Sequence, residues 1–199
     1  ALDLETTSLD ASEARIVQIG ALRMNRGKID TTSVMDKIVD PGIPVPSAST
    51  AIHGISNAML RTAPDLKKAW QGLQEFIKNR VLIGHTIAYD LTILAAEAQR
   101  HGLKWEKPRS LCIRHLAPLA LPDLHDPSLD KLAAWFDIRV EHRHSALSDA
   151  QAAGEIFLKL VPLLQEKGIR TLAEAERAIL MRSVAGLRQG QEAGWERPV

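Results

Sequence analysis

Two β-rich segments lie close together near the N-terminus, on either side of a short turn. Residues 15–25 (RIVQIGALRMN) and 28–39 are rich in apolar and β-branched residues, and Arg26-Gly27 separates them. A glycine in a two-residue connection is typical of a tight β-hairpin. Before this hairpin, Leu2 and Leu4 alternate with acidic residues, which predicts a further short strand. We therefore expect the domain to begin with three strands.

The hydrophobic pattern changes after a loop over 41–49 that holds three prolines. Apolar residues recur at helical spacing from Asp65, a favoured N-terminal capping residue, to Ile77. Short strands are predicted at 81–84 and 110–113, with further helices at 89–101, 113–121, 128–136, 145–167 and 171–187, and a frayed tail over 188–199. Strands followed by alternating helices and strands predict an α/β domain, a mixed β-sheet flanked by helices. We expect the aromatic side chains on these helices to lie in the core: Trp70, Phe76, Trp135, Phe136 and Phe157.

Composition excludes several classes of protein. Lys plus Arg total 25 and Asp plus Glu total 24, so the net charge of +1 excludes a strongly cationic nucleic-acid coat. The one cysteine, Cys112, excludes an internal disulfide framework and a multi-cysteine zinc site. No apolar run approaches the roughly 20 residues of a membrane span, and no signal peptide is visible, so we expect a cytoplasmic protein. The chain opens at Ala1 without Met, which suggests attachment to other domains of a longer chain.

Acidic residues occur in the first predicted strand. Asp3 and Glu5 are two residues apart, so both side chains leave the same face of the strand. One interpretation is a solvated strand end. The other is a cation site, because adjacent carboxylates stay ionised most easily with a cation between them, and Mg²⁺ needs only a few carboxylate ligands.

Two later segments supply further acidic candidates. Asp90 follows the strand at 81–84 at the start of a helix, where a capping role is the alternative. Asp149 lies early in the helix at 145–167 beside an apolar stripe, so its carboxylate needs a partner. His144 precedes it by five residues, and a surface histidine is its alternative. The nearby Arg139, His142 and Arg143 belong to a solvated loop or contact phosphate.

The motifs DLETTSLD, GHTIAYDLTIL and HSALSDA resemble, in this order, the three motifs of the DEDDh exonucleases. These are 3′→5′ exonucleases of the ribonuclease H-like superfamily, which includes the proofreading subunit of bacterial DNA polymerase III. The segment Ile52-His53-Gly54-Ile55 resembles an H-G-I segment common in that family. The tyrosine branch of the superfamily has a tyrosine where this chain has Ser145, so the histidine branch fits. The resemblance covers roughly residues 1–160.

The resemblance implies a ribonuclease H-like fold with an exonuclease domain over 1–168, its first strand truncated, and a C-terminal helix and tail over 169–199. It also implies two Mg²⁺ or Mn²⁺ ions and a His144 general base that takes a proton from a metal-bound water. The four carboxylates that would hold these ions are Asp3, Glu5, Asp90 and Asp149.

In such enzymes Thr6, Ile52 and His53 line the pocket for the terminal nucleotide, and Tyr89 either stacks on a base or packs in the core. The expected substrate is single-stranded nucleic acid with a free 3′ end, either DNA or short oligonucleotides. Two alternatives stay open: an exonuclease that trims RNA or degrades oligoribonucleotides, and a non-catalytic nucleic-acid-binding module of a larger protein.

Overall fold

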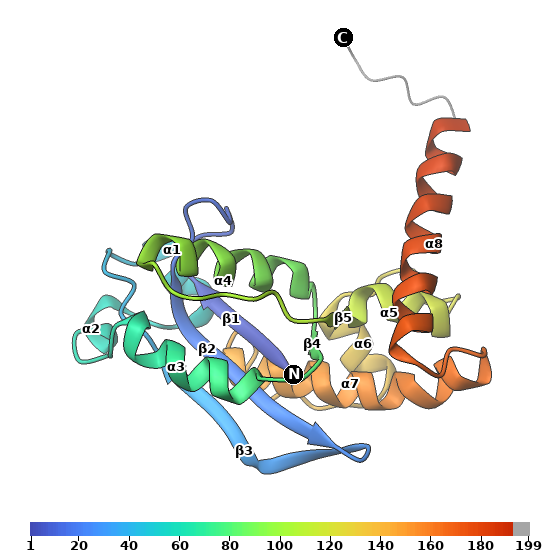
Figure 1. The fold of residues 1–199 in the computed structure, drawn as a ribbon, viewed down its shortest axis with the longest axis horizontal. Helices are drawn as coiled ribbons and strands as arrows, with labels where there is room; N and C mark the ends of the chain where they lie inside the picture. Colours follow the sequence, from blue (N-terminus) through green and yellow to red (C-terminus); the bar gives the residue numbers. More distant parts are fainter. Residues whose placement is uncertain (193–199) are drawn as a thin grey trace.

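The computed structural model describes residues 1–192, with the side chains of residues 1–184, and it confirms the α/β class (Figure 1). Strands β1 (Leu2–Thr6), β2 (Ile16–Asn25) and β3 (Lys28–Ile38) form an antiparallel sheet in the order β1-β2-β3. Strands β4 (Leu82–Gly84) and β5 (Ser110–Cys112) form a parallel pair. Antiparallel and parallel pairing are both present, divided between two sheets.

The turn between β2 and β3 is the predicted hairpin. Arg26 and Gly27 have φ of 50° and 76°, and Asn25 pairs with Lys28. Two successive residues in the left-handed region are the requirement of a type I′ turn, which suits the twist of an antiparallel pair. The expected hairpin is confirmed.

Helices account for most of the remaining chain; α3 to α8 follow the predicted pattern, whereas α1 and α2 were not predicted. Asp65 caps its helix by accepting a hydrogen bond from the Lys68 N–H. The helices are α1 (Ser47–His53), α2 (Asn57–Leu60), α3 (Leu66–Ile77), α4 (Ile87–His101), α5 (Ile113–Ala120), α6 (Leu129–Trp135), α7 (Ala146–Glu166) and α8 (Leu172–Glu192). Helix α1 begins inside the predicted loop, α4 begins two residues earlier than expected, and α8 continues past residue 187 to Glu192. Residues 193–199 of the expected tail lie outside the described part.

The core has two main clusters of buried apolar side chains. In the first, Leu2 and Leu4 of β1 pack with residues of α3 and α4, such as Leu73 and Leu94. In the second, residues of α7 such as Ile156 pack with α5, α6 and β5. Side chains alternate along a strand, so the acidic residues of β1 lie on the face opposite to Leu2 and Leu4.

Strand β2 and the start of α7 approach each other closely. A Cβ atom added to Gly20 would lie 2.1 Å from the Ala146 carbonyl carbon, so only glycine fits at this contact. Gln18, two residues earlier, accepts a hydrogen bond from the Ala146 N–H at 3.1 Å. The first turn of α7, which carries Asp149, is therefore fixed against the sheet.

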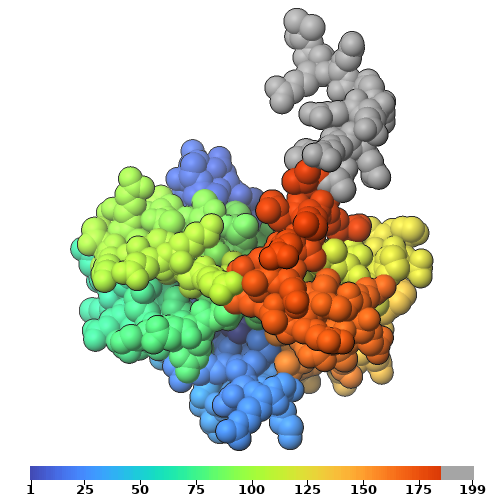
Figure 2. Space-filling model, turned by 45° about the vertical axis from the view of Figure 1, so that its right-hand side comes forward, coloured from blue at the N-terminus to red at the C-terminus, as the bar shows by residue number. Residues whose placement is uncertain are grey.

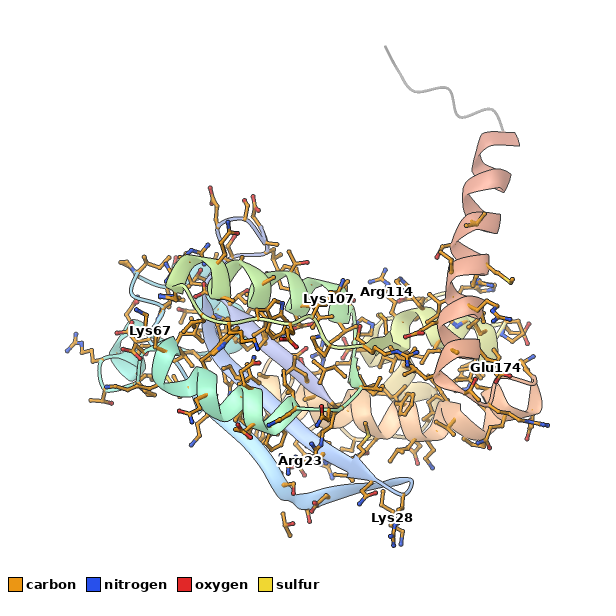
Figure 3. The ribbon with its side chains drawn as sticks, in the orientation of Figure 1. Arg23, Lys28, Lys67, Lys107, Arg114 and Glu174 are labelled. Carbon is orange, nitrogen blue, oxygen red and sulfur yellow. The ribbon has the colours of Figure 1, made fainter. Side chains whose placement is uncertain are left out.

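Arg23 connects the far end of β2 to α3 (Figure 3). Its guanidinium donates to the Glu75 and Phe76 carbonyls, and its carbon Cζ lies 4.6 Å from the centre of the Phe76 ring. Capping of carbonyl groups at a helix end by a cation is favourable because the negative end of the helix dipole lies there.

Helix α8 packs its first turns against α5 and the end of α7, and Figure 2 shows the orange and red segments as one continuous surface. Within residues 1–192, no helix is long and apolar enough to cross a membrane. Trp70 is buried, and Phe76, Phe136 and Phe157 are partly buried against the core, as expected. Trp135 is 52% exposed, so its predicted core position is wrong.

Candidate active site

The strand β1 carries two of the predicted site residues on one face. Asp3 and Glu5 are partly buried. Leu2 and Leu4, which alternate with them along the strand, are buried on the opposite side. The alternation expected from the sequence is thus present. Neither carboxylate lies at a freely solvated strand end.

Asp90 lies in the first turn of α4 and is buried. The capping position belongs to Thr86, so the alternative role of Asp90 as the N-cap is wrong. The Asp90 Oδ1 atom accepts a hydrogen bond from the Leu4 N–H at 3.1 Å. This bond places Asp90 beside β1, at the residue that separates Asp3 from Glu5 along the strand.

Asp149 lies in the first turn of α7 with its side chain 8% exposed. Its Oδ2 atom accepts hydrogen bonds from the Arg143 guanidinium and, at 3.3 Å, from the His144 N–H. Its Oδ1 atom is buried and has no hydrogen-bond partner among the described residues. One oxygen of Asp149 is therefore held by protein groups, while the other is available.

His144 precedes α7, and its side chain is exposed. Its φ of 61° lies in the left-handed region, which turns the backbone N–H toward Asp149. Glu5, His144 and Asp149 each offer one potential ligand atom, and these three atoms lie within 4.8 Å of one another. Residues up to 144 positions apart in the sequence therefore converge on one small site.

The four carboxyls of Asp3, Glu5, Asp90 and Asp149, together called the acidic group, are crowded and partly or fully buried. Burial raises the pKa of Asp90 to about 8. Burial, with the charge of Asp149 adding to it, raises the pKa of Glu5 to about 7. The pKa of Asp3 lies well above its ordinary value because of burial, followed by the charges of Asp90, Asp149 and Glu5. Such a group of carboxyls retains protons at neutral pH unless a cation is present.

Two of the residues expected to line a nucleotide pocket, Thr6 and Tyr89, contact each other and are next to Glu5 and Asp90 in the sequence. The Thr6 Oγ1 and Tyr89 Oη atoms are 3.1 Å apart, and both hydroxyls lie within hydrogen-bond distance of the Ser8 carbonyl oxygen. Tyr89 is partly buried against the first core cluster, so its ring is fixed at one edge and its hydroxyl is engaged. Ile52, by contrast, is 49% exposed.

His53 is partly buried at the end of α1, and its Nδ1 atom accepts a hydrogen bond from the Ile55 N–H at 3.0 Å. Burial lowers its pKa, and the nearby His144 lowers it further. His53 thus faces the same region as the acidic group.

Sequence reasoning did not identify three residues that organise the site. Arg143 is the partner that Asp149 required, and it also donates to Asp130 Oδ1 at 2.6 Å through Nε. Gln18 and Gly20 fix the start of α7, as described above. The short HRHS run before the helix was the available signal for Arg143, whereas the other two contacts span more than 120 residues.

Comparison with known proteins gives a consistent result. Residues 1–157 match the exonuclease family named RNase T. A PolC-type DNA polymerase III from Caldanaerobacter subterraneus subsp. tengcongensis is 34% identical over 92% of this chain, and a DNA polymerase III subunit epsilon-like protein from Rhodobacter capsulatus is 36% identical over 85%. The matched part is only 13% and 24% of these two relatives.

Solved structures show the same fold. Exonuclease X in complex with 5′ overhanging duplex DNA superposes with a TM-score of 0.69 at 21% identity, covering 89% of this chain and 97% of that one. The nuclease domain of 3′hExo, a DEDDh family member bound to rAMP, gives 0.68 at 14% identity, covering 85% and 92%. Escherichia coli Exonuclease I with a dT13 oligonucleotide gives 0.70 at 15% identity, covering 83% and 41%.

These neighbours have the ribonuclease H-like fold expected from the motifs. Because the family match covers most of the chain and includes all three motifs, the chain belongs to the RNase T exonuclease family and is a DnaQ-like 3′→5′ exonuclease that hydrolyses phosphodiester bonds.

Proposed function

We propose that this chain releases nucleoside 5′-monophosphates from the 3′ end of single-stranded DNA or short oligonucleotides. Two divalent cations, Mg²⁺ or Mn²⁺, would be held by Asp3, Glu5, Asp90 and Asp149, and His144 would act as the general base. The observation that carries this proposal is the grouping of Glu5, His144 and Asp149 ligand atoms within 4.8 Å.

The residues present fit hard divalent cations. All four acidic groups offer carboxylate oxygens, which are the ligands that Mg²⁺ and Mn²⁺ prefer. The buried Oδ1 of Asp149 has no protein partner within the described residues, which is costly unless something else contacts it. The raised pKa values of Glu5 and Asp90 are also those of a group whose negative charge is only partly compensated. When bound, the cations would lower the pKa of a water molecule and stabilise charge on the reacting phosphate.

His144 has the features that a general base requires. Its backbone N–H is bonded to Asp149, so the position of the residue does not depend on its ring. The exposed ring is free to accept a proton from an attacking water and to pass it to solvent. A neutral imidazole accepts a proton through its unprotonated ring nitrogen, which makes histidine a frequent general base.

The neighbouring residues support cleavage from an end. We propose that Thr6, Ile52, His53 and Tyr89 contact the terminal nucleotide, because Thr6 follows Glu5, its hydroxyl contacts that of Tyr89 beside Asp90, and His53 lies near His144. The exposed Ile52 provides apolar surface for a base, and Tyr89 provides an aromatic edge. A base that lies against such a surface must be unpaired, which favours single strands and frayed ends.

Two further proposals concern organisation. We propose that residues 1–168 are the exonuclease domain and that 169–199 add a C-terminal helix and tail. The small fraction of each relative that is matched supports covalent attachment of this domain to others in a longer chain.

The similarity to DNA polymerase III proteins favours DNA as substrate, and the binding of rAMP by the 3′hExo nuclease domain makes RNA the outcome to test against it.

The test uses DNA and RNA oligonucleotides of one sequence, labelled at the 5′ end and incubated with Mg²⁺, Mn²⁺ or EDTA. We expect stepwise shortening of DNA, release of nucleoside 5′-monophosphates, and no reaction in EDTA. A covalently closed single-stranded circle should resist digestion, and Asp149→Asn, purified in parallel, controls for contaminating nucleases. Cleavage of circles as fast as linear strands, or turnover in EDTA, would overturn the proposal, and faster shortening of RNA would replace the DNA assignment.

A further inference from the structure

Arg143 joins two helices at the edge of the acidic group. Its Nε donates to Asp130 on α6 at 2.6 Å, and its Nη1 donates to Asp149 Oδ2 on α7. The two acceptors differ sharply in environment, because the Asp130 side chain is 66% exposed and that of Asp149 is 8% exposed. The guanidinium therefore spans from the solvent edge into the site.

The positive charge of Arg143 acts on more than its direct partner. It lowers the pKa of Asp3 and of Glu5, opposing the effect of burial on both carboxyls. Arg143 thus supplies positive charge to three of the four carboxylates.

The two oxygens of Asp149 are in different states. Oδ2 accepts from Arg143 and from the His144 N–H, whereas Oδ1 is buried without a partner among the described residues. A cation could reach Oδ1 while the ion pair at Oδ2 persists, but a guanidinium and a divalent cation at one carboxylate repel each other. Binding of a divalent cation to the site therefore destabilises the ion pair between Arg143 and Asp149.

We propose that Arg143 is the internal counter-ion of the metal-free site and that the divalent cation displaces it from Asp149, while Asp130 retains the guanidinium at the edge. This inference rests on the proposed metal site. It assigns to Arg143 a positioning role in which it holds Asp149 in place before metal binds and weakens metal affinity by competing for the same carboxylate. Only molecules in which the ion pair between Arg143 and Asp149 is broken bind the metal with undiminished affinity.

The test measures Mn²⁺ affinity of the metal-free protein without substrate, by calorimetry or by the electron paramagnetic resonance signal of free Mn²⁺. Measurements at pH 8.5 reduce competition from protons on the carboxyls. Arg143→Gln is expected to bind Mn²⁺ about 2- to 5-fold more tightly, the range for loss of one competing ion pair. Arg139→Gln, which removes an exposed arginine of the same loop, is the matched control and is expected to change the affinity less than twofold.

A second readout is the melting temperature in EDTA and in Mn²⁺. Without metal, Arg143→Gln should melt at a lower temperature than wild type. The rise in its melting temperature on adding Mn²⁺ should be larger than that of wild type. If this variant does not fold, Arg143→Lys keeps the charge but cannot form both bonds of the guanidinium fork, and a smaller tightening is expected. Unchanged or weaker Mn²⁺ binding by the folded variant overturns the inference.

Asp149→Asn separates this inference from the proposed function. If the wild type binds Mn²⁺ and Asp149→Asn does not, the metal site stands, and the result for Arg143→Gln judges the counter-ion alone. If Asp149→Asn binds Mn²⁺ as tightly as the wild type, the metal site itself is wrong.

Discussion

Gln18 on β2 accepts a hydrogen bond from the N–H of Ala146, the first residue of α7, at 3.1 Å. The other end of the same side chain donates to Asp36 Oδ1 on β3 at 2.7 Å. One buried amide therefore connects two strands to the helix that carries Asp149. The position of that carboxylate depends on the sheet, and substitutions at this contact should affect the site from a distance.

Gly20→Ala is expected to disturb both the fold and the metal site. Its new Cβ would lie 2.1 Å from the Ala146 carbonyl carbon, so the start of α7 must move. We expect a loss of about 1–3 kcal/mol in the free energy of unfolding, typical of overpacking, with weaker Mn²⁺ binding. Urea unfolding and Mn²⁺ titration measure the two effects.

Gly154→Ala, on the same helix, is the matched control. Its nearest contact is the flexible Met24 side chain, with a Cβ to Sδ distance of 3.3 Å. Because alanine favours a helix over glycine, this variant should be as stable as wild type or more stable. Equal behaviour of the two variants would show that the β2–α7 contact does not position the site.

The Asp3→Asn and Asp149→Asn variants should both lose most activity yet differ in stability without metal. Asp3 is crowded by other carboxyls, so the amide relieves repulsion and should raise the melting temperature at pH 8. Asp149 forms an ion pair with Arg143, and loss of this pair in Asp149→Asn should lower the free energy of unfolding by about 1 kcal/mol. Thermal melts in EDTA compare them directly, and near-normal nuclease rates in either variant would mean that the site is misplaced.

The metal-free protein should become less stable as the pH rises. Folding raises the pKa of Glu5 from 4.5 to about 7 and that of Asp90 from 3.8 to about 8, so the folded state binds more protons than the unfolded state. The stability contributed by these protonated groups is complete below pH 4 and is lost as the pH rises through 7 and 8.

Urea unfolding in EDTA at pH 5, 7 and 9 tests this dependence, whose slope is at most about 1.4 kcal/mol per pH unit for each titrating group. Glu5→Gln should flatten the profile, and Mg²⁺ binding at pH 7 should release protons, measurable by calorimetry in two buffers. Stability that rises with pH in this range would contradict the raised pKa values.

His144→Asn should lower kcat by about 10²–10⁴-fold, the usual contribution of a general base. Asparagine tolerates the left-handed backbone that His144 adopts, so the N–H bond to Asp149 should persist. Mn²⁺ affinity should be unchanged. The exposed neighbour His142 provides the control, as His142→Asn. A parallel loss of Mn²⁺ affinity would instead make His144 a metal ligand or a residue that positions Asp149.

Local patterns in the sequence predicted most of the elements, because their causes are local. Alternation in β1 placed Asp3 and Glu5 on one face, and Arg26-Gly27 supplied the backbone conformation that the hairpin needs. Motifs within a dozen residues likewise marked Asp90 and Asp149. Each depends on neighbours in the chain, which a single sequence displays.

The remaining contacts depend on residues far apart in the sequence. Arg143 looked like part of a solvated loop, since its pairing with Asp130 depends on how α6 meets α7. Trp135 fits an apolar helical position, yet α6 ends at this residue and leaves the ring exposed. The Gln18 contact joins residues 128 positions apart, and no periodic pattern records it.

Asp90 also serves the backbone, because its carboxylate accepts the N–H of Leu4 where a strand carbonyl would otherwise do so. Replacement by an apolar residue would leave a buried amide without an acceptor, a cost of about 1–3 kcal/mol that is independent of catalysis. A descendant of this domain that has abandoned hydrolysis would still need an oxygen at this position. Asparagine here, with the other acidic residues lost, would be the mark of such an ancestry.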